Sequence, residues 1–325
     1  METDRTPEPA DEVSFRAGTV ALCGRPNVGK STLLNALVGS DLAVATRFPQ
    51  TTRERLLGVW SEAGFQAVLV DTPGIHRAKS ALNKFMVDEA LRGAQAVDLV
   101  LMLAEAPMLA DIAAAEAWEP GPAATAALES IAAAGRPIAL VLTKCDRVED
   151  KALLLPIIHK WSTLHPFTAL IPISATTGEG LPALREHVVA ALPVAAPLFP
   201  EDQLSDRAVR WHAGERVRAA LFDHLRDELP YCCAVTVESF KEQRKPARDI
   251  VHASVHVERE SQKPMVIGRG AATIKAISMS ARRAIAELTG RPCELYLEVK
   301  VTPNWTRDPA LMQRLGLHAP VGGLS

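Results

Sequence analysis

The sequence predicts two domains of different classes, a doubly wound α/β domain with a mostly parallel sheet and then a smaller α+β unit. Three observations predict this arrangement. Short apolar runs alternate with helical stretches up to about residue 192. A Pro-rich segment follows, and after it the pattern becomes helix, strand, strand, helical pair and strand. A chain of 325 residues is long enough for two medium hydrophobic cores.

The apolar runs of the first part are expected to be strands. Most are continuous rather than alternating, as in parallel strands covered on both faces. Strands are expected at 18–24, 53–61, 65–72, 97–104, 136–143 and 168–174, and helices at 30–38, 80–94, 123–134, 151–163 and 181–191. Only three residues join the second strand to the third, too few for a crossover helix. These two strands should therefore form an antiparallel hairpin at one edge of the sheet.

Composition shifts set the domain boundaries. We expect an N-terminal tail at 1–16, the α/β domain at 17–192, a Pro-rich linker at 193–206, the α+β unit at 207–305 and a frayed tail at 306–325. Within the α+β unit we expect a helix at 207–228, strands at 232–240, 250–259 and 293–302, and a Gly-interrupted helical pair at 264–289. The acidic, Pro-bearing start lacks the basic and apolar regions of a signal peptide.

Charge is distributed unevenly between the two parts. Residues 1–204 carry 17 Lys and Arg against 24 Asp and Glu, whereas residues 205–305 carry 17 against 13. A mildly acidic first part and a basic second part suggest that the second part binds any polyanion, although chance scatter is the alternative. The five cysteines have no CxxC spacing, which indicates small buried residues in a reducing cytosol. The longest apolar stretch is interrupted by Asp98 and Glu105 and is too short to span a bilayer.

The stretch GRPNVGKST at 24–32 has the pattern of a phosphate-binding loop. Gly24, Gly29, Lys30 and Ser31 fit G-x-x-x-x-G-K-[ST], between an apolar strand and a helix, as the motif requires. Glycines let the backbone turn its N–H groups toward phosphate oxygens at the helix N-terminus. Lys30 would place its charge between the β- and γ-phosphates, and Ser31 would offer a hydroxyl to Mg²⁺. The whole loop is expected to contact nucleotide: Gly24, Arg25, Pro26, Asn27, Val28, Gly29, Lys30, Ser31 and Thr32.

Two further segments are expected to meet the γ-phosphate. DTPG at 71–74 follows a strand, so Asp71 would hold Mg²⁺ through water and the Gly74 N–H would meet the γ-phosphate, with Thr72 and Pro73 beside them. In PQTTRER at 49–55, Thr52 would close over the γ-phosphate and add its hydroxyl to Mg²⁺; Thr51 is the rival. The alternative for DTPG is an ordinary turn, and the alternative for PQTTRER is a β-rich surface loop.

The base is selected by TKCD at 143–146. A carboxylate at Asp146 can accept hydrogen bonds from N1–H and the N2 amino group of guanine, whereas adenine offers no donor at either position. Polar mismatches of this kind discriminate by about 10⁴ or more. Thr143 and Lys144 accompany Asp146, and Lys144 would lie flat over the base. In the next strand-end segment, Ser174, Ala175 and Thr176, the Ala175 N–H would meet guanine O6. This order of motifs favours a guanine nucleotide, and the alternative, a plain P-loop ATPase, fails if guanine nucleotides compete for the site and ATP does not.

With these motifs in place, the first part resembles the translation-factor-related small GTPases. PEDQLSDR at 200–207, IVHASVHVER at 250–259 and SQKPMVIGRGAATIK at 261–275 narrow the resemblance to the Era family of bacterial ribosome-assembly GTPases, over about residues 17 to 305. The resemblance implies a P-loop GTPase domain followed by a type II KH domain. It also implies 16S rRNA binding near the 3′ end on the 30S subunit, and a cytoplasmic protein with a peripheral membrane-associated fraction. No obligate protein partner is evident.

The expected RNA-binding residues surround a Gly-rich loop between two helices. Gly268, Arg269, Gly270 and Ala271 would clamp the nucleic-acid backbone, as KH loops do. Arg269 and Lys275 would contact phosphates, and Arg282 and Arg283 would extend the basic face. Ile267, Ile274 and Ile277 either line a groove for bases or belong to the core.

The sequence departs from the family pattern at two positions. The fourth position of the GxxG motif is Ala271, which fits if its φ is negative. Thr143 stands where guanine readers usually have Asn, but its hydroxyl can still brace the phosphate loop.

The expected catalytic set is Lys30, Thr52, Gly74 and Asn27. Many GTPases place a Gln directly after the DxxG glycine to orient the attacking water, but Ile75 occupies that position here. Intrinsic hydrolysis should therefore be slow. Asn27 is found in potassium-stimulated relatives, which makes K⁺ a second candidate cofactor beside Mg²⁺. In this hypothesis GTP orders residues 41–56 and 74–85 and thereby biases rRNA binding. The alternative is a signalling or membrane-recruitment GTPase whose second domain binds a protein or lipid surface.

Overall fold

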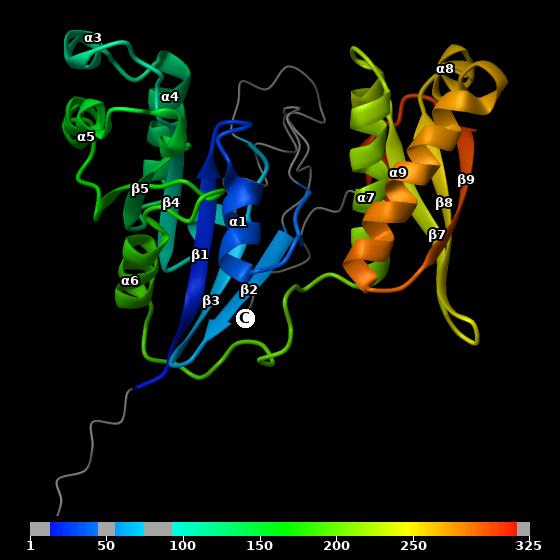
Figure 1. The fold of residues 1–325 in the computed structure, drawn as a ribbon, viewed down its shortest axis with the longest axis horizontal. Coiled ribbons are helices and arrows are strands. Elements are labelled where there is room, and N and C mark those ends of the chain that lie inside the picture. Colours follow the sequence, from blue (N-terminus) through cyan, green and yellow to red (C-terminus); the bar gives the residue numbers. More distant parts are fainter. Residues whose placement is uncertain (1–13, 45–55, 75–92, 317–325) are drawn as a thin grey trace, which may run out of the picture.

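The computed structural model describes residues 14–44, 56–74 and 93–316, which form two domains side by side (Figure 1). The first domain contains a six-stranded sheet in the order β2-β3-β1-β4-β5-β6, and the second a three-stranded sheet in the order β7-β8-β9. Expectations for Thr51, Thr52, Ile75, the helix up to residue 92, and residues 1–13 and 317–325 of the two tails lie outside the described residues.

The six strands of the first sheet confirm the expected doubly wound pattern. Their bounds are β1 (Arg16–Gly24), β2 (Leu56–Glu62), β3 (Phe65–Asp71), β4 (Leu99–Glu105), β5 (Ile138–Thr143) and β6 (Leu170–Pro172). β2 pairs antiparallel with β3, and the other neighbours pair in parallel. The hairpin at the sheet edge was thus predicted correctly. Every residue of β3 and β5 is buried, which is why these strands read as continuous apolar runs.

Helices cover both faces of this sheet. The bounds are α1 (Lys30–Val38), α3 (Ile112–Ala117), α4 (Pro122–Ala132), α5 (Leu154–Ser162) and α6 (Leu181–Ala191). Alternate strand residues separate two cores, one packed against α3, α4 and α5 and the other against α1 and α6. The short helix α3 was not expected as a separate element. Asp111 caps it by accepting from Ala114 N at 2.8 Å.

The linker stays in contact with the first domain. Its last residues run antiparallel to the edge strand β2, where Val59 N donates to Leu204 O at 2.9 Å and Gly58 bridges Ser205. The linker therefore extends the sheet by a short stretch before the second domain begins.

The second domain has the expected order of helix, two strands, two helices and strand. The bounds are α7 (Val209–His224), β7 (Ala234–Arg244), β8 (Ala247–Val257), α8 (Lys263–Ile267), α9 (Ala272–Thr289) and β9 (Cys293–Val301). β7 pairs antiparallel with β8, and β8 pairs in parallel with β9. One core joins α7 and α9 to a single face of the sheet (Figure 1).

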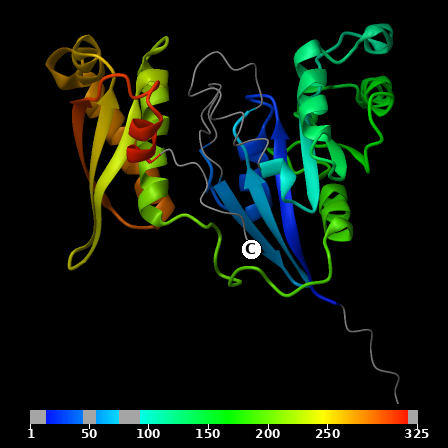
Figure 2. The same ribbon diagram turned by 180° about the vertical axis from the view of Figure 1, so that it is seen from behind.

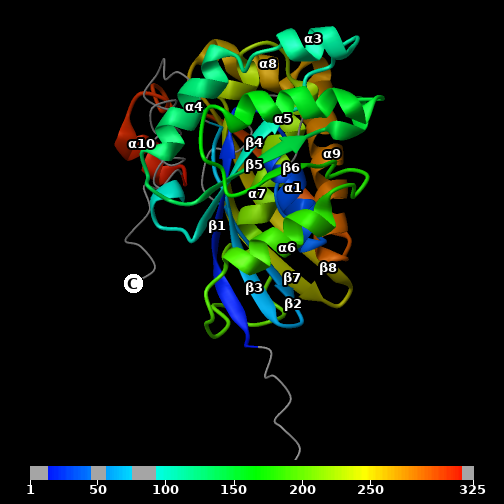
Figure 3. The same ribbon diagram turned by 90° about the vertical axis from the view of Figure 1, so that its left-hand side faces the viewer.

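The expectation of a frayed tail is wrong for residues 306–316. Helix α10 (Pro309–Arg314) begins after Asp308, whose carboxylate accepts from Ala310 N at 2.8 Å. Met312 is buried with Ala234 and Trp305, whose indole donates to Cys232 O at 3.1 Å. Figures 2 and 3 show α10, coloured red, against the second domain. An Asp before a Pro is a helix-start signal that was present in the sequence.

Within residues 14–44, 56–74 and 93–316, no helix is both long and apolar enough to cross a bilayer.

Candidate nucleotide site and nucleic-acid interface

The strand order brings the expected nucleotide motifs to one edge of the first sheet. The phosphate loop follows β1, DTPG follows β3, TKCD ends β5 and the Ser174 segment follows β6. These four strands run in parallel, with β3 beside β1 and β5 beside β6. Ligands of open α/β sheets bind outside the carboxyl ends of such strands.

The backbone of the phosphate loop explains its glycines. Gly24 and Gly29 have φ values of +147° and +100°. A Cβ on Gly24 would lie 2.5 Å from the Leu103 carbonyl oxygen, so even alanine would be excluded there. Asn27 also has a positive φ, +62°, a conformation that Asn tolerates better than most residues. The loop ends where α1 begins at Lys30, which turns the N-terminus of that helix toward the loop.

Lys30 is held inside the loop. Its side chain is buried, and Nζ donates to the Arg25 carbonyl at 3.0 Å and to the Gly24 carbonyl at 3.4 Å. Burial lowers the pKa of the Lys30 ammonium, and the nearby Asp71 carboxylate partly offsets this effect. An anion in the loop would favour the charged form, as a phosphate-binding lysine requires.

Two of the three expected Mg²⁺ ligands meet. The Ser31 hydroxyl donates to Asp71 Oδ2 at 2.8 Å, and Asp71 is fully buried at the end of β3. A hydroxyl and a carboxylate are the hard oxygen ligands that Mg²⁺ takes beside nucleotide phosphates. These residues therefore fit Mg²⁺. Thr52, the third expected ligand, lies outside the described residues.

DTPG lies directly against the phosphate loop. A Cβ on Gly74 would be 2.6 Å from Pro26 N, so the two backbones touch at this point. Thr72 anchors DTPG by donating from Oγ1 to the Leu22 carbonyl at 2.8 Å. A larger residue at Gly74 would push the two phosphate-facing loops apart.

Thr143 braces the phosphate loop, as the sequence predicted. Its Oγ1 lies 2.6 Å from the Val28 carbonyl oxygen and 3.3 Å from that of Ala104, and the side chain is buried. The hydroxyl thus joins the end of β5 to the phosphate loop. It supplies a polar contact in place of the Asn that is usual at this position.

The base-reading segments are joined to one another. Cys145 N donates to the Ile173 carbonyl at 3.1 Å, which links TKCD to the segment after β6. Asp146 is exposed in a short 3₁₀ helix (Cys145–Arg147), and Ala175 is half-buried. Ser174 Oγ lies 3.0 Å from Thr176 Oγ1 and accepts from Thr177 N at 3.2 Å, so this segment is ordered by its own side chains.

Glu105 was missed by the sequence reasoning. Its carboxylate pairs with Lys144 at 2.7 Å and with Arg147 at 2.9 Å, and it lies opposite Thr143 in the β4–β5 register. The pair holds the Lys144 side chain beside the base-reading edge. Only the register between the two strands reveals this contact, because Glu105 had been noted solely as a break in an apolar run.

The Gly-rich loop of the second domain adopts a left-handed backbone over three positions. Gly268, Gly270 and Ala271 have φ values of +74°, +59° and +63°. The condition under which Ala271 would fit without strain, a negative φ, is therefore not met. A Cβ on Gly268 would lie 2.2 Å from Thr273 Oγ1, which fixes glycine at that end. The opposite end accepts Ala271 at the cost of a left-handed conformation, typically about 1–2 kcal/mol for a residue with a Cβ.

The basic residues expected to contact RNA lie at the surface around this loop. Arg269, Lys275, Arg282 and Arg283 are all exposed. Arg283 pairs with Glu287 at 2.9 Å, and Arg282 donates to the Cys293 carbonyl at 3.1 Å. Of the apolar candidates, Ile277 is fully buried in the core, so it does not line a groove. Ile267 and Ile274 are half-buried against that core.

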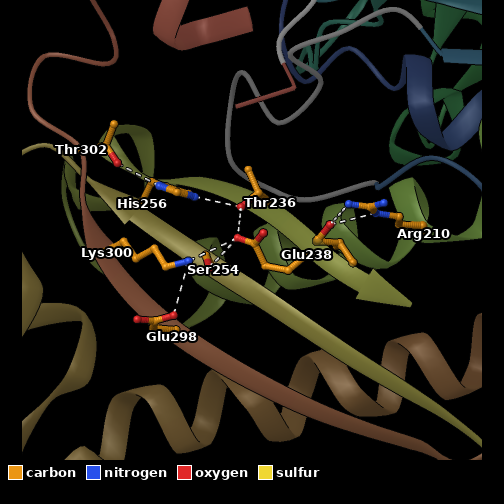
Figure 4. Close-up of polar contacts among 9 residues, drawn as sticks. Arg210, Thr236, Glu238, Ser254, His256, Glu298, Lys300 and Thr302 are labelled. Atoms are coloured by element: carbon orange, nitrogen blue, oxygen red, sulfur yellow. Dashed lines mark hydrogen bonds and ion pairs between the residues drawn. The ribbon is translucent and has the colours of Figure 1, made fainter. Parts of the chain in front are cut away.

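A polar network covers the face of the three-stranded sheet opposite α7 and α9 (Figure 4). Thr236 Oγ1 lies 2.9 Å from His256 Nε2, and Glu238 accepts from Ser254 at 2.9 Å. Burial lowers the pKa of His256, so neutral imidazole is favoured there. These hydrogen bonds join β7 to β8, and His256 also contacts Thr302 just after β9, which indicates a structural role.

The strain at Ala271 gives the first prediction. Ala271→Gly should raise the free energy of unfolding by about 0.5–1 kcal/mol, because relief of the left-handed strain exceeds the extra chain entropy of glycine. Ala272→Gly is the matched control: Ala272 has φ −63° at the start of α9, so glycine should destabilise it by about 0.5–1 kcal/mol. Urea unfolding of the full chain measures both. Equal destabilisation by the two changes would contradict the strain.

Comparisons with known proteins agree with this geometry. The family model described as "50S ribosome-binding GTPase" matches residues 19–144, and the model described as "KH domain" matches residues 228–306. The GTPase Era of Geotalea uraniireducens is 42% identical over 305 residues, covering 94% of this chain and 99% of that protein. The GTPase Era of Nitratidesulfovibrio vulgaris is 40% identical, covering 94% and 98%.

Solved structures of this family match over the same length. Aquifex aeolicus Era bound to GDP and AlF₄⁻, as a Y63A variant, has a TM-score of 0.85 and 33% identity, covering 94% of this chain and all of that chain. An Era in complex with MgGDPNP and nucleotides 1506–1542 of 16S ribosomal RNA has a TM-score of 0.86 and 32% identity, with the same coverage. The nucleotide motifs lie at one sheet edge, and a KH domain follows them in the sequence. The chain therefore belongs to the Era family of GTPases.

Proposed function

We propose that this chain is a GTP-controlled factor that binds 16S rRNA near its 3′ end and assists assembly of the 30S subunit. The observation that carries the proposal is that one chain joins the guanine-nucleotide edge to an exposed basic loop in a KH domain. The related Era that was solved with MgGDPNP and a 16S rRNA segment supports both ligands. GTP and GDP are then the states of the factor, and rRNA is its target.

The residues at the sheet edge have separate roles in GTP binding and hydrolysis. Asp146 accepts hydrogen bonds from guanine, and the loop from Gly24 to Thr32 surrounds the phosphates. Lys30 stabilises the charge that develops between the β- and γ-phosphates as their bond breaks. Ser31 and Asp71 are placed to hold Mg²⁺, which when bound neutralises phosphate oxygens. The Gly74 N–H contacts the γ-phosphate from the other side.

Two catalytic details remain part of the proposal. Thr52, rather than Thr51, closes over the γ-phosphate. Asn27, exposed and left-handed in the phosphate loop, helps to hold K⁺ near the transferring phosphate. With Ile75 in the position of the water-orienting Gln, hydrolysis is slow, as suits a timed switch.

GTP turnover tests these details. Thr52→Ala should abolish Mg²⁺-dependent hydrolysis because a ligand of the metal is lost, whereas Thr51→Ala should retain it. Replacing KCl by NaCl at equal ionic strength should lower wild-type turnover. Loss of hydrolysis in Thr51→Ala but not in Thr52→Ala would reject Thr52 as the Mg²⁺ ligand. An unchanged rate in NaCl would remove K⁺ from the proposal.

In the proposed RNA interface, basic side chains beside the Gly-rich loop contact RNA phosphates electrostatically. Arg269 and Lys275 are exposed beside the loop at 268–271, where phosphates can approach the glycine backbone. Each lost phosphate contact reduces the salt dependence of single-strand binding by a slope of about 0.7. The proposal also places the protein in the cytoplasm with a peripheral membrane-associated fraction.

Filter binding with a short 3′-terminal 16S RNA at about 50 and 200 mM salt tests the RNA target. We expect salt-dependent binding that Arg269→Ala and Lys275→Ala weaken and flatten. Arg136→Ala, which removes an exposed charge from the first domain, should have no effect. Sedimentation with anionic lipid vesicles tests the membrane fraction. Vesicle binding without RNA binding would favour the alternative, a membrane-recruitment GTPase.

A further inference from the structure

Helix α7 of the KH domain contacts the loop that follows α1 of the GTPase domain. The Arg216 guanidinium donates to the backbone carbonyl of Asp41. One turn earlier on the same face, the buried His212 ring lies beside the backbone of Leu42. The Arg216 guanidinium also lies near the Asp41 carboxylate, whose charge attracts it. The bond to the Asp41 carbonyl depends on where the loop lies.

The same loop is tied to the phosphate-binding helix from its other side. Asn35 Nδ2 donates to the Ala43 carbonyl at 2.8 Å, and Ala43 N donates to Asn35 Oδ1 at 2.8 Å. Asn35 lies on α1 four residues after Ser31, and residues at this spacing share one face of a helix. Residues 41–43 thus lie between the helix that begins at the phosphate loop and the first helix of the KH domain.

The linker forms hydrogen bonds with the residues that follow segment 45–55 in the sequence. Leu57 N donates to Asp206 Oδ1 at 3.1 Å, and Val59 N donates to the Leu204 carbonyl at 2.9 Å. Ser205 Oγ lies 3.3 Å from His212 Nε2, which joins the linker to α7. We call the contacting residues Leu204, Ser205, Asp206, His212 and Arg216 the linker–α7 clamp. It contacts residues 41–42 before this segment and 57–59 after it.

The clamp continues into the RNA-binding part of the KH domain. Helix α7 packs along α9, and both contribute to the same core. Helix α9 begins at Ala272, immediately after the Gly-rich loop. A displacement of α7 is therefore transmitted to α9 by close packing, since packed helices move as units.

We propose that Arg216 and His212 are positioning residues that couple nucleotide state to RNA affinity through the linker–α7 clamp. This inference rests on the proposed function, because it names the regulation of that RNA site. The nucleotide shifts α1, the residues 41–43 that Asn35 ties to it and residues 57–59 relative to α7, and the clamp passes the shift to α7 and α9. Coupling is reciprocal, so bound RNA changes nucleotide affinity by the same factor.

A plain structural contact between the domains makes a different prediction. It would change stability or RNA affinity equally in both nucleotide states. Coupling residues change the ratio of the RNA dissociation constants measured with GDP and with a non-hydrolysable GTP analogue. That ratio is the readout that separates the two roles.

The experiment compares this ratio in wild type, Arg216→Ala and the double variant His212→Phe with Arg216→Ala. For the wild type we expect a ratio of about 5–150, the usual range of allosteric coupling. The ratio should fall at least threefold toward one in Arg216→Ala and further in the double variant. Arg216→Lys, which retains a donor for the Asp41 carbonyl, should restore part of it. Intrinsic hydrolysis without RNA should stay within twofold of wild type.

Arg210→Ala is the matched control. Arg210 lies on the same helix, but its guanidinium donates to the Val237 carbonyl of β7, inside the KH domain (Figure 4). Its removal should leave the ratio unchanged. A wild-type ratio of one, or equal ratios in wild type and both Arg216→Ala variants, would overturn the inference.

Hydrogen exchange of the α7 amides provides a second readout that needs no RNA. In the wild type, exchange over residues 209–224 should differ between GDP and the GTP analogue, and Arg216→Ala should remove the difference. If RNA fails to bind while this difference persists and depends on Arg216, the proposed function fails but the clamp stands. If RNA binds and exchange in α7 is the same with both nucleotides, the clamp fails instead.

Discussion

The contact between the Thr143 hydroxyl and the Val28 carbonyl organises the nucleotide site. At 2.6 Å and out of contact with water, it joins the end of β5, where the proposed base-reading residues lie, to the proposed phosphate loop. Without it, a buried carbonyl of the phosphate loop would lose a hydrogen-bond donor, which costs about 1–3 kcal/mol. The Ser31–Asp71 pair and the Lys30 position depend on the same loop holding its shape. The guanine and phosphate subsites therefore form one unit.

Strand-end motifs were readily predicted from sequence because sheet topology fixes where they go. Parallel strands place their carboxyl ends at one edge, so Asp71, Thr143 and Ser174 had to gather there once the strands were recognised. The brace by Thr143 followed from its place at the end of β5. Glu105 could not be found in this way, since its pairing with Lys144 depends on the β4–β5 register.

The errors arose where a residue's surroundings, rather than its own preference, decide the local conformation. Ala271 takes a left-handed backbone because the turn after Gly268 must return against Thr273, and a residue's own preference does not reveal that constraint. Residues 306–316 are ordered because Trp305 and Met312 pack against Ala234, about 70 residues earlier in the sequence. The contacts from the linker and α7 to the first domain likewise join residues that are far apart in the sequence. Composition identified a linker, but only the fold shows that it lines a sheet edge.

The most direct test of the account is nucleotide affinity after Thr143→Val, which keeps the side-chain shape and removes the hydroxyl. GDP binding should weaken by about 5- to 150-fold, since about 1–3 kcal/mol is lost. Thr143→Ser, which keeps the donor, should stay within about threefold of wild type, a difference under about 0.7 kcal/mol. A Thr143→Val protein that binds GDP as tightly as Thr143→Ser would contradict the claim that this hydroxyl holds the two subsites together.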